Sequence, residues 1–400
     1  MSQSVNTRME APSMKTAFKN GYETLFGQQW PYWVAGVLLG TINVFMFAYA
    51  RPWSSADGIR NWGDWFFNTV GLADRTIIPP HLFSTSVLNF GIVIGSLAAA
   101  LFAKQFALRM APSRELFKGL IGGLLMGIGS SLAFGCNIGG FFSATSALSM
   151  AGPAMMLGLM IGAVIGLKLL LFEVEYLSPA VSKRVSPKKS QGADLKKIQP
   201  LAGLLVVVIG FFLVFIYDDL DYSERAGILS FGLLIGIIMQ RSRFCFVRAF
   251  REPFMTGHGD ASKAVAIAVI ISVTGFSILK WTDLREWETL VSIGFWAGSL
   301  VGGIVFGIGM TLAGGCGSGS VWRAGEGHIK LWLALFGFAL AGSYSRAWLE
   351  DSGWLMKLGT QVFLPDVIGW KLSYISIVGL MLLWYFLATW NEIKGKFVIV

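Results

Sequence analysis

Long apolar runs, separated by short polar segments, dominate the chain. Each run is close to the 20 residues that a helix needs to cross a hydrocarbon core of about 30 Å. The runs show no two-residue alternation, which excludes an outer-membrane barrel. The pattern therefore predicts an all-α polytopic membrane protein with about ten transmembrane segments. These segments are expected at 31–50, 82–103, 119–136, 153–172, 201–217, 227–240, 261–280, 291–313, 329–348 and 367–390.

Composition and charge agree with this fold class. Apolar side chains make up 54% of the 400 residues and charged ones only 14%, which excludes a globular cytosolic enzyme. If all ten segments cross, 22 Lys and Arg residues fall at one side and nine at the other, and Lys168 inside a span completes the 32. The positive-inside rule then places both termini in the cytoplasm. The rule also explains the net charge of +9 without a nucleic-acid partner, and we expect membrane lipid as the surrounding medium.

The chain divides into five predicted regions. Residues 173–200, rich in Lys and Arg, form a cytoplasmic linker that is either a plain solvated loop or a docking strip for an acidic partner or anionic lipid. Six tryptophans near predicted span ends are expected to anchor in the headgroup zone: Trp30, Trp33, Trp53, Trp281, Trp287 and Trp390. The regions are 1–81 with the first span, 82–172 as a first repeat half, the linker 173–200, 201–348 as a second half, and 349–400 with the last span.

An internal repeat relates the two halves. LIGGLLMGIGSSLAFGC (120–136) aligns without a gap on LVGGIVFGIGMTLAGGC (300–316), with ten of 17 positions identical. Five glycines and a cysteine keep their register, which a chance apolar match would not do. In the predicted topology the two copies run in opposite directions. Inverted repeats with a pathway at their interface are a recurrent construction of transporters.

Each copy runs into a glycine-rich stretch that is too polar for an ordinary span. The stretches are Cys136–Gly140 and Gly314–Ser320. They predict helix breaks, or re-entrant helices, whose free backbone N–H groups can receive an anion. Glycines four residues apart elsewhere, such as Gly158/Gly162 and Gly303/Gly307, predict close helix packing instead.

The three cysteines are the candidate chemistry. The chain has three cysteines, Cys136, Cys245 and Cys316, and none belongs to a CxxC motif. Neither a disulfide framework nor a zinc site is therefore indicated. A lone cysteine in an apolar helix is usually a small buried hydrophobe. Two of these, however, occupy equivalent positions beside the predicted breaks, and Cys245 lies among cations that favour a thiolate or hold an anion. The spans carry almost no carboxylate or histidine, which disfavours a metal site and a proton relay.

Three segments together resemble the YeeE/YedE family of sulfur-transport membrane proteins. They are FGCNIGG (134–140), QRSRFCF (240–246) and GGCGSGSVWRAGEG (314–327). The order of the two halves is that of YedE-like members, and the YedE branch is associated with selenium metabolism. The resemblance implies bacterial inner-membrane uptake of thiosulfate or a related sulfur anion, with a small cytoplasmic TusA-like carrier as partner. It also implies a pathway lined by Cys136, Cys245 and Cys316.

A relay along these thiols needs no covalent step. The terminal sulfur of the anion meets successive S–H groups while backbone amides stabilise the charge. We expect Cys136 toward the outer side, Cys316 toward the inner side and Cys245 near the cytoplasmic end of its helix. Glu326 is expected to pair with Arg323. The residues predicted to bind or gate the anion are Gly135, Asn137, Gly315, Gly317, Arg243, Arg323 and Glu326.

Three other functions remain open. The first is transport of a selenium species through the same path. The second is an intramembrane thiol-dependent sulfurtransferase or redox enzyme, against which the lack of CxxC argues. The third is a passive channel in which the cysteines only pack. We favour transport and therefore predict no catalytic residue, no metal and no cofactor.

Overall fold

The computed structural model describes residues 14–177 and 193–399, and these residues are predominantly helical, with no β-strand among them. The π-helical and 3-10 turns are labelled η. The elements are α1 (Met14–Tyr22), η1 (Glu23–Gly27), α2 (Tyr32–Tyr49), α3 (Ala56–Thr69), α4 (Ser84–Phe102), α5 (Ser113–Leu132), η2 (Asn137–Ser143), α6 (Ala144–Ser146), α7 (Ala151–Phe172), η3 (Glu173–Leu177), α8 (Ala193–Asp219), α9 (Ser223–Ser242), α10 (Phe246–Met255), α11 (Asp260–Trp281), α12 (Ala297–Ala313), α13 (Gly317–Gly325), α14 (Ile329–Asp351), η4 (Trp354–Lys357), α15 (Leu364–Ile368) and α16 (Trp370–Lys394).

Nine helical segments of the described chain are long and apolar enough to cross a membrane, which makes this a multi-pass membrane protein. They correspond to nine of the ten predicted segments. The tenth, 329–348, lies within α14, which is 23 residues long but carries charged side chains at both ends. The all-α polytopic prediction is confirmed.

Helices α5 and α12, which carry the repeated sequence, cross in contact with each other. A Cβ added at Gly122 would lie 2.6 Å from the carbonyl oxygen of Gly309, and one added at Gly129 would lie 2.6 Å from that of Gly302. In the repeat alignment, which is shifted by 180 residues, Gly122 corresponds to Gly302 and Gly129 corresponds to Gly309, so the two contacts are equivalent. This reciprocity is the pattern that a two-fold relation between antiparallel copies produces. The helix contact is close because neither partner has a side chain.

The neighbouring helices follow the same pattern. Helix α7 packs on α12 where Gly162 meets Gly307, and α14 packs on α5 where Gly342 meets Gly127. Adding 180 to the residue number relates Gly162 to Gly342 and Gly127 to Gly307, so the two contacts are equivalent in the repeat. The prediction that glycines four apart serve close packing is confirmed. The inverted repeat itself stays a prediction with which these contacts agree.

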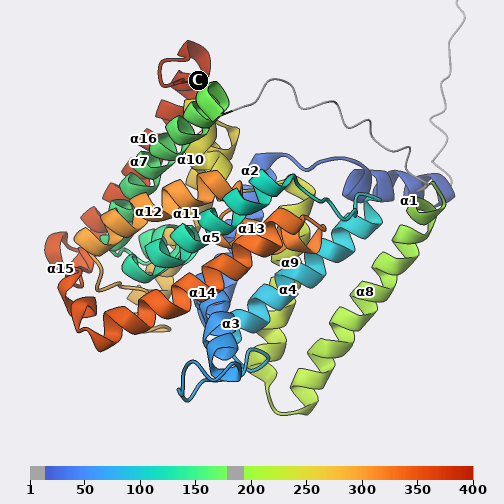
Figure 1. The fold of residues 1–400 in the computed structure, drawn as a ribbon, viewed down its shortest axis with the longest axis horizontal. Helices are drawn as coiled ribbons and strands as arrows, with labels where there is room; N and C mark the ends of the chain where they lie inside the picture. Colours follow the sequence, from blue (N-terminus) through green and yellow to red (C-terminus); the bar gives the residue numbers. More distant parts are fainter. Residues whose placement is uncertain (1–13, 178–192, 400) are drawn as a thin grey trace, which may run out of the picture.

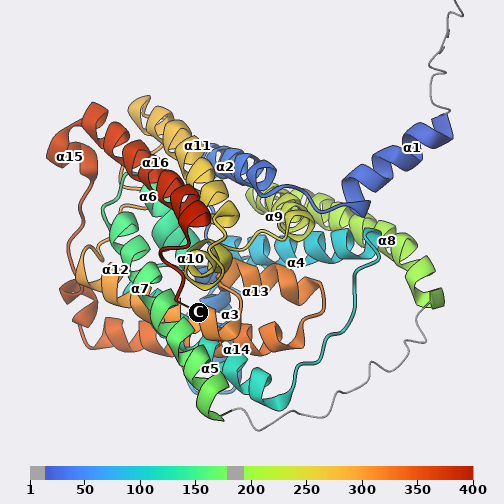
Figure 2. The same ribbon diagram turned by 90° about the horizontal axis from the view of Figure 1, so that it is seen from above.

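The central and peripheral helices are distinguished in the ribbon views. Helices α5, α12, α13 and α14 lie near the centre of Figure 1. Helix α8 lies along the right edge and contacts α4 and α9. On the opposite flank α16 lies beside α11 (Figure 2). Most side chains of α8 are exposed, as expected of a helix that faces lipid.

The chain ends share one half of the molecule. Helix α1, the C-terminal residues and the two helix ends that flank 178–192 all lie in the upper half of Figure 1. Residues 1–13 and most of the predicted basic linker, 178–192, lie outside the described residues. The cytoplasmic location of both termini stays a prediction.

Two expectations near the first span are wrong. No helix is predicted between the first two spans, yet residues 51–81 contain α3, which packs against α4 and α14. Trp53, expected as an interfacial anchor, is fully buried among aromatic rings. The physical reason is that the chain turns back into the core after α2, so the indole covers the centre instead of the membrane surface.

Candidate functional site

All three cysteines occupy the same local position, the residue immediately before a helix that starts inside the protein. Cys136 precedes η2, Cys245 precedes α10 and Cys316 precedes α13. The breaks predicted at Cys136 and Cys316 are therefore present, and Cys245 adds a third. All three are free thiols with at most 1% of their surface exposed.

Cys245 and Cys316 lie next to each other, from helices far apart in sequence. A methyl group at Gly319 would be 2.9 Å from the Sγ of Cys316 and 3.1 Å from the Sγ of Cys245. The backbone N–H of Gly319 donates to the Cys316 sulfur at 3.3 Å. We call Cys245, Cys316 and Gly319 the two-thiol site.

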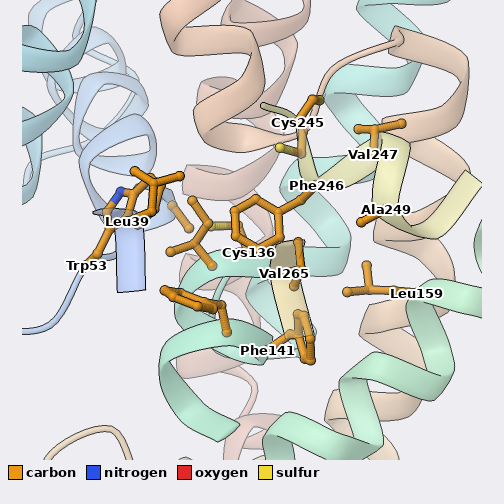
Figure 3. Packing of buried hydrophobic residues seen from close by; sticks show 14 of the residues in the cluster. Leu39, Trp53, Cys136, Phe141, Leu159, Cys245, Phe246, Val247, Ala249 and Val265 are labelled. Atoms are coloured by element: carbon orange, nitrogen blue, oxygen red, sulfur yellow. The ribbon is translucent and has the colours of Figure 1, made fainter. Parts of the chain in front are cut away.

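Cys136 has a comparable setting with one thiol. Its sulfur lies near the backbone N–H groups of Ser55 and Ala56 at the start of α3, and of Ile138 and Gly139. We call these five residues the one-thiol site. Figure 3 shows Cys136 in the same buried cluster as Cys245, Trp53 and Phe246.

The two sites adjoin each other at the residues that follow the two repeat cysteines. A Cβ at Gly317 would be 3.6 Å from the Cys136 sulfur. Conversely, the side chain of Asn137 lies beside the Cys316 thiol. The amide of Asn137 is fully buried, and neither its nitrogen nor its oxygen has a hydrogen-bond partner among the described residues. The three cysteines thus form one continuous group with an unused polar group between them.

The glycines before the cysteines are needed for tight packing. A Cβ at Gly135 would lie 2.6 Å from the nitrogen of Gly140, and one at Gly315 would lie 2.8 Å from the hydroxyl of Ser320. Gly135 and Gly315 therefore allow each chain to fold closely against the helix that follows its cysteine.

An ion-pair network around the buried carboxylate of Glu326 adjoins the two-thiol site. The guanidinium of Arg243 donates to both carboxylate oxygens of Glu326, at 2.6 and 2.7 Å, and to the side-chain oxygen of Gln105 at 2.6 Å. Arg109 and His328 lie 3.6 and 3.5 Å from the same carboxylate. The prediction that Glu326 pairs with Arg323 is wrong, because Arg323 turns back and donates to the carbonyl of Gly314 at 2.9 Å.

Glu326 is fully buried and lies just beyond the membrane-spanning segment. Burial raises the pKa of its carboxyl, but the hydrogen bond with His328 and the charges of Arg243 and Arg109 outweigh burial and lower the pKa to about 2. The carboxylate is therefore charged at any physiological pH. Its role is to hold Arg243 in place.

Trp322 separates the two arginines of this region. Arg243 lies 5.9 Å and Arg323 5.2 Å from the centre of its ring, and the ring is completely buried. The position that corresponds to Trp322 beside Cys136 is Phe142, which contacts Trp53 and Phe246 edge to face. Both sites are thus walled by aromatic side chains.

A cavity of about 150 Å³ lies against the one-thiol site. Its lining includes Ala56 and Gly135, the chain neighbours of Ser55 and Cys136, together with Arg60, Arg346 and Asp57. The Nε of Arg60 is buried without a hydrogen-bond partner among the described residues. Sequence reasoning missed this cavity, since its arginines come from α3 and α14, which are distant in the chain.

The geometry defines a class first: a multi-pass membrane protein in which three buried thiols and the starts of internal helices meet at one centre. The family model described as "Sulphur transport" matches residues 2–165 and 241–397. The chain therefore belongs to this family of sulfur transporters, the YeeE/YedE family.

Curated relatives carry names that agree. The chain is 29% identical to "Probable transporter YedE" of Escherichia coli over 66% of its own length and 65% of the relative, which is less than two thirds of that protein. It is 26% identical to "Probable transporter YedE" of Salmonella typhimurium over 82% and 84% of the two chains. "Thiosulfate transporter TsuA" of Escherichia coli is 36% identical over 29% of this chain and 32% of that protein. The names indicate transport in preference to catalysis.

Proposed function

We propose that this protein carries thiosulfate or a related sulfur anion inward across the bacterial inner membrane, along a path past Cys136, Cys316 and Cys245. The observation that carries the proposal is the meeting of three thiols, each at a helix start, in one buried group. The matched relatives that are named thiosulfate transporters support the substrate class.

The chemistry suits an anion with one soft end. Thiosulfate presents a terminal sulfur, which a thiol S–H can meet as a weak donor, and oxygens, which backbone N–H groups can receive. Because thiols and amides alternate along the group, the anion can move by exchanging weak contacts. Such a relay breaks and forms no covalent bond.

The other predicted residues take supporting roles in this proposal. Asn137 offers its unused amide between the two sites, and Gly317 leaves room beside Cys136. Gly135 and Gly315 shape the turns. Arg323 and Arg243 supply positive charge near the two-thiol site, with Arg243 held by Glu326.

We further propose that the two-thiol site faces the cytoplasm and the one-thiol site faces outward, as the positive-inside rule predicts. A small TusA-like sulfur carrier would then receive the anion's sulfur at the cytoplasmic side. Weak multi-site binding suits this delivery, since a tightly held ion would not leave.

Uptake of radiolabelled thiosulfate by cells without other sulfur importers tests the proposal. Each of Cys136→Ser, Cys245→Ser and Cys316→Ser is expected to lower uptake at least tenfold at equal membrane abundance, because a hydroxyl does not reproduce the soft sulfur contact. Thiosulfate uptake by the parent that all three variants retain would contradict the thiol path and support a passive channel.

The adjacent thiols of Cys245 and Cys316 favour a second candidate, a thiol-dependent sulfurtransferase or redox enzyme. Mass spectrometry of the purified protein after turnover distinguishes it, since a persulfide or disulfide on either residue would support enzyme chemistry. A selenium substrate is tested by competition, because selenite would then inhibit uptake more strongly than unlabelled thiosulfate does.

A further inference from the structure

We propose that Ser55 is a fourth anion-binding residue of the path, the hydroxyl counterpart of Cys245, and that it binds the oxygen end of a sulfur oxyanion. The inference rests on the proposed function and adds a residue and a division of labour to it. None of the three sequence motifs contains Ser55.

The first observation is positional. Ser55 precedes α3, which follows α2, just as Cys245 precedes α10, which follows α9. The repeat alignment equates Cys136 with Cys316. The thiol of Cys316 lies beside Cys245, and the thiol of Cys136 lies beside the backbone N–H of Ser55. Each repeat cysteine thus meets the residue before an internal helix that comes earlier in the chain.

Packing around these helices supports the correspondence. A Cβ at Gly40 would lie 2.7 Å from the carbonyl of Ala268, where α2 meets α11. A Cβ at Gly91 would lie 2.7 Å from the carbonyl of Leu229, where α9 meets α4. The pairs α2–α11 and α9–α4 are the partners that a two-fold exchange of the halves requires.

The second observation is chemical. Ser55 is fully buried, and its hydroxyl has no hydrogen-bond partner among the described residues. A serine at this position normally caps its own helix, yet the Ser55 side chain makes no capping hydrogen bond. An unpaired buried hydroxyl costs free energy, so a ligand that pairs with it binds more tightly.

The third observation is access. The cavity that holds Arg60 and Arg346 touches Ala56 and Gly135, the chain neighbours of Ser55 and Cys136. The lining carries two guanidinium groups and one carboxylate, Asp57, which lies 3.7 Å from Arg60, so it bears a net positive charge that favours an anion at the one-thiol site. The start of α3, a helix of 14 residues, adds the N–H groups of Ser55 and Ala56.

These observations divide the recognition between the two sites. Hydroxyl and amide donors suit the oxygens of a sulfonate group, whereas two adjacent thiols suit a terminal sulfur. Thiosulfate carries both ends. Sulfate carries only the first and should therefore compete at the one-thiol site.

Uptake kinetics of Ser55→Ala test this assignment. A lost hydrogen bond to a charged ligand predicts a KM for thiosulfate raised about tenfold or more, with sulfate inhibition weakened by the same factor. Ser55→Cys should fall between parent and Ser55→Ala, because a thiol is a weaker donor. Cys245→Ser should lose thiosulfate transport, while binding of sulfate to the purified variant stays as in the parent.

Ser277→Ala is the matched control, since Ser277 on α11 also has a buried hydroxyl without a partner among the described residues. It should leave the KM unchanged. Failure of the parent to take up thiosulfate would overturn the proposed function. A parent that transports thiosulfate but shows no sulfate inhibition, or an unchanged KM in Ser55→Ala, would overturn the role of Ser55 alone.

Discussion

The one-thiol and two-thiol sites share a backbone plan but differ in their side chains. Both place a repeat cysteine before one internal helix and next to the start of another. The two-thiol site adds Arg243, Arg323 and a buried carboxylate, whereas aromatic rings and a serine surround Cys136. In the proposed path, the two sites therefore share their backbone donors, and their side chains make the two ends unequal.

Inequality between the ends has a physical use. If every position along a transport path bound the anion with the same affinity, neither entry at one end nor release at the other would be favoured. In the proposed path, two thiols beside Arg243 and Arg323 at one end, and one thiol beside a hydroxyl and backbone N–H groups at the other, separate the approach of the anion from its release. The following experiments remove one difference at a time.

Glu326→Gln should have the largest effect. It leaves Arg243 and Arg109 without their carboxylate; because both guanidinium groups are about a third exposed, we expect a loss of about 3 kcal/mol, the lower end of the range for fully buried ion pairs. Thermal unfolding of the purified protein in detergent measures the loss. The control is Glu350→Gln, whose pair with Arg346 is part-exposed and should contribute less than about 1 kcal/mol. Equal effects of the two variants would show that the network does not distinguish the two sites.

Acid titration should give the next largest effect. Since folding lowers the pKa of Glu326 from 4.5 to about 2, its ionisation adds about 3 kcal/mol of stability above pH 4.5. This contribution is lost as the pH falls from 4.5 toward 2. The stability gap between parent and Glu326→Gln should therefore be constant from pH 8 to 5 and narrow below 4.5. A gap that narrows already near pH 6 would contradict the assignment.

Gly319→Ala and Gly139→Ala compare equivalent positions with smaller changes. The added methyl at 319 would contact both sulfurs of the two-thiol site, whereas at 139 it would lie 2.7 Å from the hydroxyl of Ser54. Overpacking of this kind costs about 1–3 kcal/mol. Thiosulfate uptake should fall about tenfold or more in Gly319→Ala and less in Gly139→Ala. The reverse order would place the narrow part of the path at the one-thiol site.

Much of this fold follows from the sequence for clear reasons. Apolar length determines where helices cross, and the glycine-rich stretches reveal the breaks at Cys136 and Cys316. The break at Cys245 escaped notice because its turn uses Arg243 in a left-handed conformation, with φ +57°, where glycine is the usual signal. The contact between Cys245 and Cys316 also could not be predicted, since it depends on how distant helices pack.

Side-chain partners were harder to predict than positions. Arg323 and Glu326 are three residues apart, which favours a pair on one helix, but Glu326 forms the last residue of its turn and faces Arg243 of another helix. Trp53 follows the first predicted span directly, which predicts an interfacial anchor, and no sequence pattern singles out Ser55. Only the folded chain returns this segment to the core.

The placement of the cysteines allows opening of the buried centre to be measured by thiol labelling without introducing a probe. All three thiols belong to the buried group, and no other cysteine exists in the chain to react in the background. A small membrane-impermeant alkylating reagent added from one face can modify a thiol only when the path opens to that face. Labelling rates, measured on the native sequence with and without substrate, would therefore test whether the proposed path opens and toward which face.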